Sequence, residues 1–487
     1  MLSTELTKQQ IKAVNYIDGP LLIVAGPGTG KTGVLTEKII YLVENGFDPN
    51  RILVCTFTVK AAEELKERIR LSLKDRVESM HISTIHSFCR DMLDTFPEYH
   101  NLGNVFKIID DLEQFIYVNR NYWNLGLRDF AKDIDAEELI NFYNKCTESD
   151  VSPDELVKYY NQNSVSEQEK AIAKSYKLYI NSLLDPNDTK LDFALLQREF
   201  YHLLMNSPEI LNAVRNMFDY ILIDEYQDTN PIQDAIIKLI SEPKFKIAVV
   251  GDEDQSIYGF RGSSIKNFMT FMDRYPNAKR MELEENFRSS KEIVDTFDEF
   301  MLSHRKFDKR IFTHNSGFSE PILIEGSSPI EEGKNVAKLI RQLVGNHNVK
   351  FGDIAILFKS VKYHSPKITK VLTEEKVPFI IIGDGALISR DEIKNFIVIM
   401  FYANFEVLDD FIKKWLLTNG SEVLRSEILN LESKTIEKLS PVMDPVNLLS
   451  SIDLSKLRSF NILPKDAETL MNLKNLEMQQ KKNTLVS

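Results

Sequence analysis

The sequence predicts an α/β fold built on a parallel β-sheet, and three observations support this prediction. Short apolar runs alternate with helical patterns near the N-terminus. A glycine-rich loop links the first apolar run to the first helical pattern. Two similar apolar runs return after a long helical block. Strands that alternate with helices favour parallel pairing with right-handed crossovers, so we expect these runs to join one sheet.

The first region supplies the beginning of this sheet. Leu21–Ala25 reads LLIVA and predicts a buried strand, which a helix over 29–43 follows. A second strand is expected over 51–57 and an amphipathic helix over 61–73. The pattern then turns helical, and the expected helices of this block cover residues 91–96, 111–119, 136–145 and 166–183.

Strand signals return with Tyr220–Ile223 (YILI) and Ile247–Val250 (IAVV). Because these strands follow a helical block, we expect one sheet domain that is interrupted by an inserted subdomain. A second alternating region begins near residue 281, and the pattern is helical again beyond residue 390. The elements expected in the second region are strands over 321–324, 354–358 and 379–382 and helices over 331–344 and 367–375.

Length and composition limit the function classes. A chain of 487 residues is too long for a single hydrophobic core. The sequence contains no run of about 18 apolar residues, so it indicates no membrane span and no membrane partner. The first residues, MLSTELTKQQ, lack the pattern of a signal peptide, so we expect a cytoplasmic protein. The net charge of −12 makes nucleic acid a less expected partner without excluding it, because binding needs only a local basic or aromatic groove.

The segment AGPGTGKT lies between the first predicted strand and the first predicted helix, where a phosphate-binding loop is needed. Its glycines allow backbone N–H groups to approach phosphate oxygens, Lys31 would reach the β and γ phosphates, and Thr32 would bind Mg²⁺. We therefore expect ATP with Mg²⁺; the alternative is a glycine-rich turn without a ligand. The residues of this predicted site are Ala25, Gly26, Pro27, Gly28, Thr29, Gly30, Lys31 and Thr32.

Two acids follow the next apolar run, in YILIDEYQD. Asp224 comes directly after four apolar residues, so it should emerge at the carboxyl end of a strand, where it can help to hold Mg²⁺. Glu225 lies beside it and can orient or deprotonate the attacking water. The alternative is that both carboxylates belong to a solvated loop.

A third apolar run continues into GDEDQSIYGFRG. Gln255 is a polar, uncharged loop residue that could bind both a γ-phosphate and the attacking water. Tyr258, Phe260 and Arg261 lie close by, and aromatic side chains in such a place can stack on the bases of a single strand. The alternative is that Tyr258 and Phe260 are core residues.

These motifs together resemble the UvrD/Rep/PcrA family of superfamily-1 DNA helicases. Seven segments occur in the family's order over roughly 290 residues. The segments are LTKQQIKAV at 6–14, AGPGTGKT at 25–32, TFTVKAAEELKERI at 56–69, STIHSF at 83–88, DEYQDTN at 224–230, GDEDQSIYGFRG at 251–262 and LEENFRSS at 283–290.

The resemblance implies roles at the nucleotide. Gln10 would read the adenine base, Phe287 would pack on the other side of that base, and Arg288 would contact the γ-phosphate. Lys31, Glu225, Gln255 and Arg288 would form the catalytic set. The residues implied to face DNA are Phe57, Thr58, His86, Tyr258, Phe260 and Arg261, the last of which would couple the DNA site to the nucleotide cleft.

The resemblance also implies a P-loop NTPase with two RecA-like cores, each with an inserted helical subdomain. ATP and Mg²⁺ would bind between the cores, and hydrolysis would drive 3′-to-5′ movement on single-stranded DNA or a 3′-tailed duplex. The expected divisions are the first core at 1–87 and 218–280, its helical insertion at 88–217, a partial second core at 281–388 and a truncated helical insertion at 389–487.

Two motifs of the family, resembling HxxKGLEF and YVAxTRA, are not found after Arg288. The second of these normally supplies another arginine to the γ-phosphate. Three explanations stay open: the chain is a fragment, a partner chain completes the second core, or motor function has been lost. We therefore expect weak ATP hydrolysis by this chain alone. The alternative function is a nucleotide-binding module that binds DNA or a partner without translocating.

Overall fold

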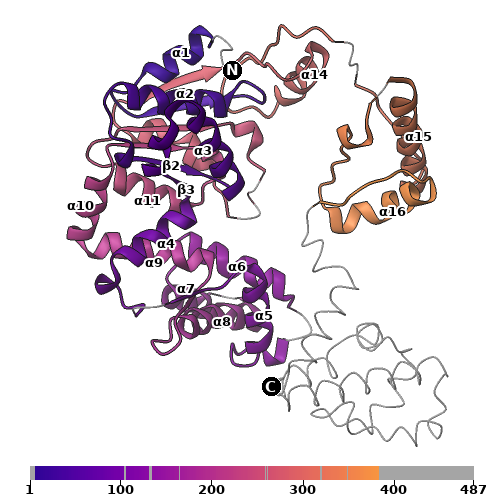
Figure 1. Ribbon diagram of the computed structural model, residues 1–487. Coiled ribbons are helices and arrows are strands. Elements are labelled where there is room, and N and C mark those ends of the chain that lie inside the picture. Colours follow the sequence, from indigo (N-terminus) through magenta and orange to yellow (C-terminus); the bar gives the residue numbers. More distant parts are fainter. Residues whose placement is uncertain are drawn as a thin grey trace, which may run out of the picture. The chain divides into compact units, whose positions relative to one another are not determined.

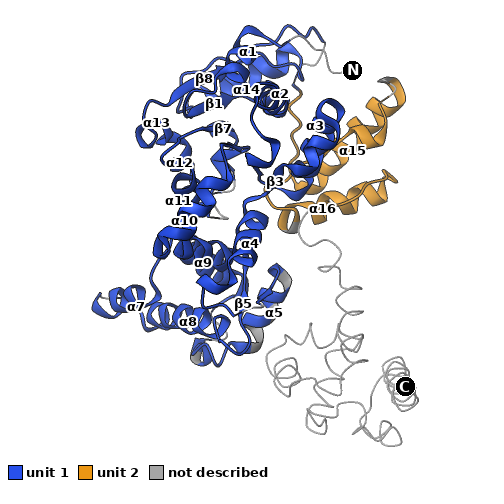
Figure 2. Ribbon diagram, turned by 60° about the vertical axis from the view of Figure 1, so that its left-hand side comes forward, with its two compact units in different colours: residues 1–321 blue, residues 322–487 orange. Residues whose placement is uncertain are grey.

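The computed structural model describes residues 6–382 apart from 104–105, 131–133, 164, 258, 260–261, 318–320 and 348. The chain divides into two compact units, residues 1–321 and residues 322–487 (Figure 2). Tyr258, Phe260 and Arg261 lie outside the described residues, as does the helical region expected over 389–487.

A six-stranded parallel sheet forms the centre of the first unit (Figure 1), so the predicted α/β class is confirmed. The spatial order is β3-β2-β6-β7-β1-β8. Strand β1 lies between β7 and β8, with Val24 opposite both Gly251 and Glu282. The strands are β1 (Leu21–Ala25), β2 (Ile52–Thr56), β3 (His81–Thr84), β6 (Tyr220–Ile223), β7 (Ile247–Gly251) and β8 (Lys279–Leu283).

Side chains of the central strands alternate between two apolar layers, as expected for a parallel sheet that is covered on both faces. Leu21 and Ile23 face a layer formed with α1 (Lys8–Asn15), α2 (Lys31–Glu44) and α3 (Val59–Leu73). Leu22 and Val24 face the opposite layer. The helices that contribute to this second layer on the sheet are α11 (Pro231–Ser241), α12 (Ile265–Met269) and α13 (Phe271–Arg274).

The helical block between β3 and β6 shares its core with the second layer. Tyr143, Tyr176 and Tyr179 are fully buried there, and the rings of Tyr143 and Tyr179 stack with centroids 4.7 Å apart. The same apolar cluster continues to Leu22 and Leu53 of the sheet. The block contains α4 (Ile85–Thr95), α5 (Asp111–Asn121), α6 (Ala136–Glu148), α7 (Pro153–Gln162), α8 (Glu167–Leu183), α9 (Phe193–Asn206), α10 (Pro208–Met217) and a parallel pair, β4 (Lys107–Ile108) and β5 (Lys190–Leu191).

Short 3-10 turns complete the first unit, and α14 (Lys291–Met301) follows the edge strand β8. Beyond α14 the chain returns towards β8, where Glu285 and Phe312 form an isolated parallel bridge. The 3-10 turns that carry site residues are η5 (Tyr226–Asp228) and η6 (Glu253–Gln255); the others are η1 (Pro49–Arg51), η2 (Lys74–Ser79), η3 (Pro97–Tyr99) and η4 (Arg128–Phe130).

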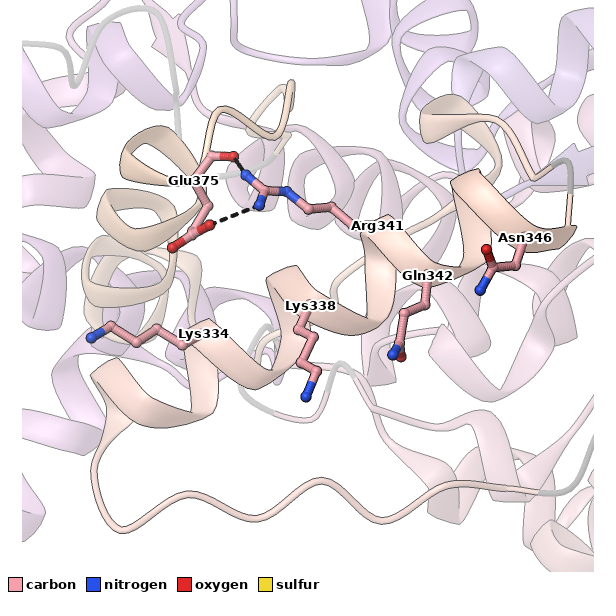
Figure 3. Close-up of a pocket in the computed structure, with 6 residues that line it drawn as sticks. All are labelled: Lys334, Lys338, Arg341, Gln342, Asn346 and Glu375. Carbon is pink, nitrogen blue, oxygen red and sulfur yellow. Dashed lines mark hydrogen bonds and ion pairs between the residues drawn. The ribbon is translucent and has the colours of Figure 1, made fainter.

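The described part of the second unit consists of α15 (Pro329–His347), the 3-10 turn η8 (Phe351–Asp353) and α16 (Val361–Glu374). Ala337 and Ile340 pack against Ile368 and Leu372 between the two long helices. A hollow of about 410 Å³ lies beside α15, where Arg341 and Glu375 form an ion pair at 3.1 Å (Figure 3).

The strands expected over 321–324, 354–358 and 379–382 are not formed in the described part of this unit. A strand needs a hydrogen-bonded neighbour, and these segments have none there. Several of their apolar side chains are therefore exposed, with Leu323 at 83%, Leu357 at 91% and Ile380 at 84%, whereas Ile354 and Phe358 pack partly against the helices. Of the helices that the structure describes, none is both long enough and apolar enough to cross a membrane.

Candidate nucleotide site

The predicted phosphate loop has the geometry of an anion site. Strand β1 ends at Ala25 and helix α2 begins at Lys31, so the loop leads directly into a helix N-terminus, where backbone N–H groups favour an anion. Gly30 precedes the helix with φ of 85°, a left-handed conformation that glycine adopts without steric cost. Thr29 closes the loop, because its Oγ1 donates to Gly26 O at 2.8 Å.

The structure brings together three of the predicted catalytic side chains. Lys31 Nζ lies 3.1 Å from Glu225 Oε2 and 3.2 Å from Gln255 Oε1. Lys31 is the first residue of α2, Glu225 directly precedes η5 and Gln255 ends η6, and these elements follow β1, β6 and β7. Because the carboxyl ends of parallel strands meet at one edge of the sheet, residues about 200 positions apart converge here.

Asp224 and Glu225 differ in environment although they are adjacent. Burial, and then the charge of Glu225, raise the pKa of Asp224 to about 6. Glu225 has φ of 48° in the left-handed region, and its N–H donates to Asp224 Oδ1 at 3.0 Å. The hydroxyl of Thr32 and the carboxylate of Asp224 are the oxygen ligands that Mg²⁺ prefers in such a loop, so the residues present fit this ion.

A ring of hydrogen bonds holds Glu225 and Gln255 in place. Gln227 Nε2 donates to Glu225 Oε2 at 2.7 Å, and Gln227 Oε1 accepts the N–H of Asp252 at 3.0 Å. Gln255 Nε2 in turn donates to Asp252 Oδ2 at 2.5 Å. Gln227 and Asp252 were not among the predicted site residues; only their place inside the two loop motifs indicated them.

Three consecutive carboxylates, Asp252, Glu253 and Asp254, lie close enough to suggest a metal site, but a lysine fills the space between them. Lys309 Nζ lies 2.9 Å from Glu253 Oε2 and 3.2 Å from Asp254 Oδ2, and it also bonds Asp252. Burial alone would lower the pKa of Lys309, but the carboxylates outweigh burial and raise it. Lys309 therefore fixes the η6 loop that carries Gln255.

Gln10 approaches the loop from α1. Its Nε2 donates to Thr29 O at 3.1 Å, and its Oε1 accepts the N–H of Thr7 at 2.9 Å. An amide has two donor hydrogens and two acceptor lone pairs, so one of each remains for a base edge. The predicted adenine reader is thus held against the phosphate loop with the capacity that adenine needs.

The turn after β8 carries Phe287 and Arg288 to the loop. The N–H of Phe287 donates to Gly28 O at 2.9 Å, and Phe287 as a residue is 49% exposed. The side chain of Arg288 is also exposed. The structure therefore places both predicted residues beside the phosphate loop within the same unit.

Two of the described residues predicted to face DNA, Phe57 and His86, line a small pocket. Phe57 and His86 line it together with Asp224 and Glu225, so this pocket reaches the acids of the nucleotide site. Burial lowers the pKa of His86 to about 4, and its ring packs edge-on against Phe193. A neutral imidazole adds no positive charge for phosphates.

Thr58 has a structural function in the same region. It caps the N-terminus of α3, where its Oγ1 accepts the N–H of Ala61 at 3.1 Å. Thr56 supports this turn from the end of β2, with its Oγ1 donating to Thr58 O at 2.9 Å.

Known proteins show similarity over most of the chain. The sequence model of the UvrD/REP helicase N-terminal domain matches residues 6–276, and that of the UvrD-like helicase C-terminal domain matches residues 281–456. The chain belongs to the UvrD/REP helicase family. The first of these matches contains the phosphate loop, both acids and Gln255, and the second begins within β8, shortly before the turn that carries Arg288.

Curated relatives give the same assignment. A probable DNA helicase II homolog of Mycoplasma capricolum is 34% identical over 478 residues, which are 97% of this chain and 62% of that protein. The ATP-dependent DNA helicase PcrA of Staphylococcus epidermidis is 32% identical over 399 residues, and that of Staphylococcus aureus is 32% identical over 401 residues. Each match covers 81% of this chain and 53% of the relative, so this UvrD/REP-family chain spans little more than half of the PcrA length.

Proposed function

We propose that this chain is the nucleotide-binding part of an ATP-dependent DNA helicase that moves 3′ to 5′ on single-stranded DNA or a 3′-tailed duplex. One observation carries the proposal: Lys31, Glu225 and Gln255 converge at the mouth of a phosphate loop. Family membership supports DNA as the substrate, and we propose a cytoplasmic location for the protein.

The geometry supports a division of labour at the nucleotide. Lys31 would bind the β and γ phosphates, and in doing so it would release Glu225 and Gln255 from their present contacts. Glu225 would then orient and deprotonate the attacking water, while Gln255 would bind the γ-phosphate. Thr32 and Asp224 would hold Mg²⁺, which neutralises charge on the phosphates.

The base would be held from two sides. Gln10 would offer its remaining donor and acceptor to the adenine edge, and the exposed ring of Phe287 would stack on the base. Arg288 would reach the γ-phosphate from the turn after β8. An arginine in this function contributes about 10³-fold or more to the rate of phosphoryl transfer.

The domain divisions at 1–87 with 218–280, 88–217, 281–388 and 389–487 are proposals too. We also propose that further strands, from a partner chain or from more of the same polypeptide, cover the apolar side chains of the second unit. The exposure of Leu323, Leu357 and Ile380 supports this. An arginine from that source would complete the nucleotide cleft, so we expect slow hydrolysis by this chain alone.

Substitution of the loop lysine tests the proposed function. We expect Lys31→Met to weaken binding of a fluorescent ATP analogue, and any DNA-stimulated hydrolysis, by roughly 100-fold because the cation for the phosphates is lost. Titration of the analogue and a phosphate-release assay with single-stranded DNA measure the two effects. Lys177→Met, on the surface of α8, is the matched control. Unchanged ATP binding in Lys31→Met would contradict the proposed function.

A further inference from the structure

The buried amide of Asn286 joins the phosphate loop to the turn that carries Arg288. Asn286 is 2% exposed. Its Nδ2 donates to Pro27 O at 2.6 Å. Its Oδ1 accepts two N–H groups, from Arg288 at 2.8 Å and from Ser289 at 2.7 Å. One side chain thus bonds two segments that are 259 residues apart.

The phosphate loop is shaped to accept this amide. Gly28 has φ of +71°, and a Cβ atom at this position would lie 2.6 Å from Asn286 Nδ2 and 2.9 Å from Arg288 Cβ. Only glycine allows so close an approach. The N–H of Phe287 adds a second contact by donating to Gly28 O. The turn is therefore docked on the loop through the carbonyl groups of Pro27 and Gly28.

The two halves of the amide have different consequences. The Oδ1 contacts shape the turn, because they fix the backbone N–H groups of Arg288 and Ser289. The Nδ2 contact sets the position of this shaped turn relative to the phosphates, because Pro27 belongs to the loop that would surround them. Arg288 is an exposed residue of this turn, so both contacts fix the backbone position from which its side chain extends.

We propose that Asn286 is a positioning residue that docks the Arg288 turn on the phosphate loop, so that Arg288 contacts the γ-phosphate only while this dock is formed. The inference rests on the proposed ATP function. It adds that recognition of the γ-phosphate depends on a hydrogen bond from an amide that does not itself touch the nucleotide.

The variant Asn286→Asp separates the two halves of the amide. The carboxylate retains the acceptor for the N–H groups of Arg288 and Ser289, but it replaces the donor that faces Pro27 O with a second acceptor. The turn should therefore keep its shape while the dock opens. Asn286→Ala, which loses both halves, is the second variant if Asn286→Asp does not fold.

The test compares the affinities of the full chain for ATPγS and for ADP, which lacks the γ-phosphate. We expect Arg288→Ala and Asn286→Asp each to weaken ATPγS binding by about tenfold, as for loss of one charge-assisted hydrogen bond. ADP affinity should change by less than about twofold. Because Asn286 acts through Arg288, the double variant should be no weaker than Arg288→Ala alone.

The matched control is Asn267→Asp. Asn267 is also buried, and its Nδ2 donates to Thr229 O and Asn230 O, away from the phosphate loop. We expect this variant to lower the melting temperature without changing the ratio of ATPγS to ADP affinity. An unchanged ratio in Asn286→Asp, or additive losses in the double variant, would overturn the proposal. If wild-type ATPγS binding did not depend on Lys31, the proposed function itself would fail instead.

Discussion

Buried charged side chains around the site hold its elements together without touching a nucleotide. Lys38, in the helix that follows the phosphate loop, is fully buried and donates to the carbonyl groups of Ala13, Val14 and Tyr16. Those carbonyl groups lie at the C-terminal end of α1, where a helix leaves acceptors unsatisfied. Lys38 thereby fastens the helix that carries Gln10 to the helix that begins at Lys31.

The stability contributed by Lys38 should depend on pH. Burial lowers the pKa of Lys38 to about 7, below its value of about 10.4 in an unfolded chain. The folded state thus binds fewer protons between these values, so the free energy of unfolding should rise with pH from about 7 to 10. In Lys38→Met, the unfolding free energy should no longer show this rise with pH. The variant should also lose about 2–3 kcal/mol of stability, because the buried carbonyl groups are left unpaired.

Urea unfolding of both proteins at several pH values measures this difference. The exposed Lys12→Met in α1 serves as the control for removal of a charge from the same region. If the difference in unfolding free energy between wild type and Lys38→Met were constant from about pH 7 to 10, Lys38 would not titrate in that range.

Sequence motifs located the residues that would touch the nucleotide, but not the residues that hold them. Lys31, Glu225 and Gln255 were predicted to act at one nucleotide, and the structure places them within hydrogen-bonding distance. Asn286 and Lys309 were not predicted as site residues. The contacts that tie them to the two loops, Asn286 with Pro27 and Lys309 with Asp252, join segments far apart in the sequence, so no local spacing indicates them.

At the scale of elements, the η6 turn depends on a cation from a distant segment. Lys309 is 4% exposed and bonds all three carboxylates of Asp252, Glu253 and Asp254. Arg305 adds ion pairs to Asp254 at 3.1 Å and Asp298 at 2.8 Å. The turn that carries Gln255 is therefore held by the chain that follows α14.

Removal of the central cation should destabilise the first unit strongly. Lys309→Met leaves three buried carboxylates without their shared partner, which should cost about 3–5 kcal/mol of unfolding free energy. Thermal and urea unfolding measure the loss. Lys306→Met, three positions away and exposed, should change stability little. Equal stability of the two variants would contradict the structural function assigned to Lys309.

Apolar patterns predicted the central strands better than the edge strands. The buried run LLIVA matches β1 at both ends, and YILI matches β6. Strands β3 (HIST) and β8 (KRMEL) were not predicted, because edge strands have a solvent-facing side and can carry polar residues. The apolar runs of the second unit were predicted as strands, yet pairing depends on a neighbour that no single run reveals.

At the scale of the whole molecule, the residues proposed for the nucleotide all belong to the first unit. Gln10, Lys31, Glu225, Gln255 and Arg288 lie within residues 1–321, and the contacts among their loops are internal to this unit. The sequence analysis assigns Arg288 to the second core, but the turn that carries it is docked on the phosphate loop.

Residues 1–321 should therefore fold alone and bind ATPγS with an affinity within about threefold of the full chain. Circular dichroism melting and nucleotide titration of the two proteins test this expectation. Loss of cooperative unfolding in the shorter protein would show that residues beyond 321 are needed for the fold. Retained folding with lost ATPγS binding would show that they contribute to the site.

At Glu225 the backbone conformation and the proposed function of the side chain favour different residues. A glutamate at φ of 48° is strained, by an amount on the order of 1–3 kcal/mol, whereas glycine or asparagine adopts this conformation more readily. Either replacement would relax the turn and remove the carboxylate beside Asp224. Selection for stability would thus favour loss of the carboxylate, whereas selection for the proposed ATP turnover would retain it. Under the role in ATP turnover proposed for Glu225, stability and activity therefore favour different residues at this position.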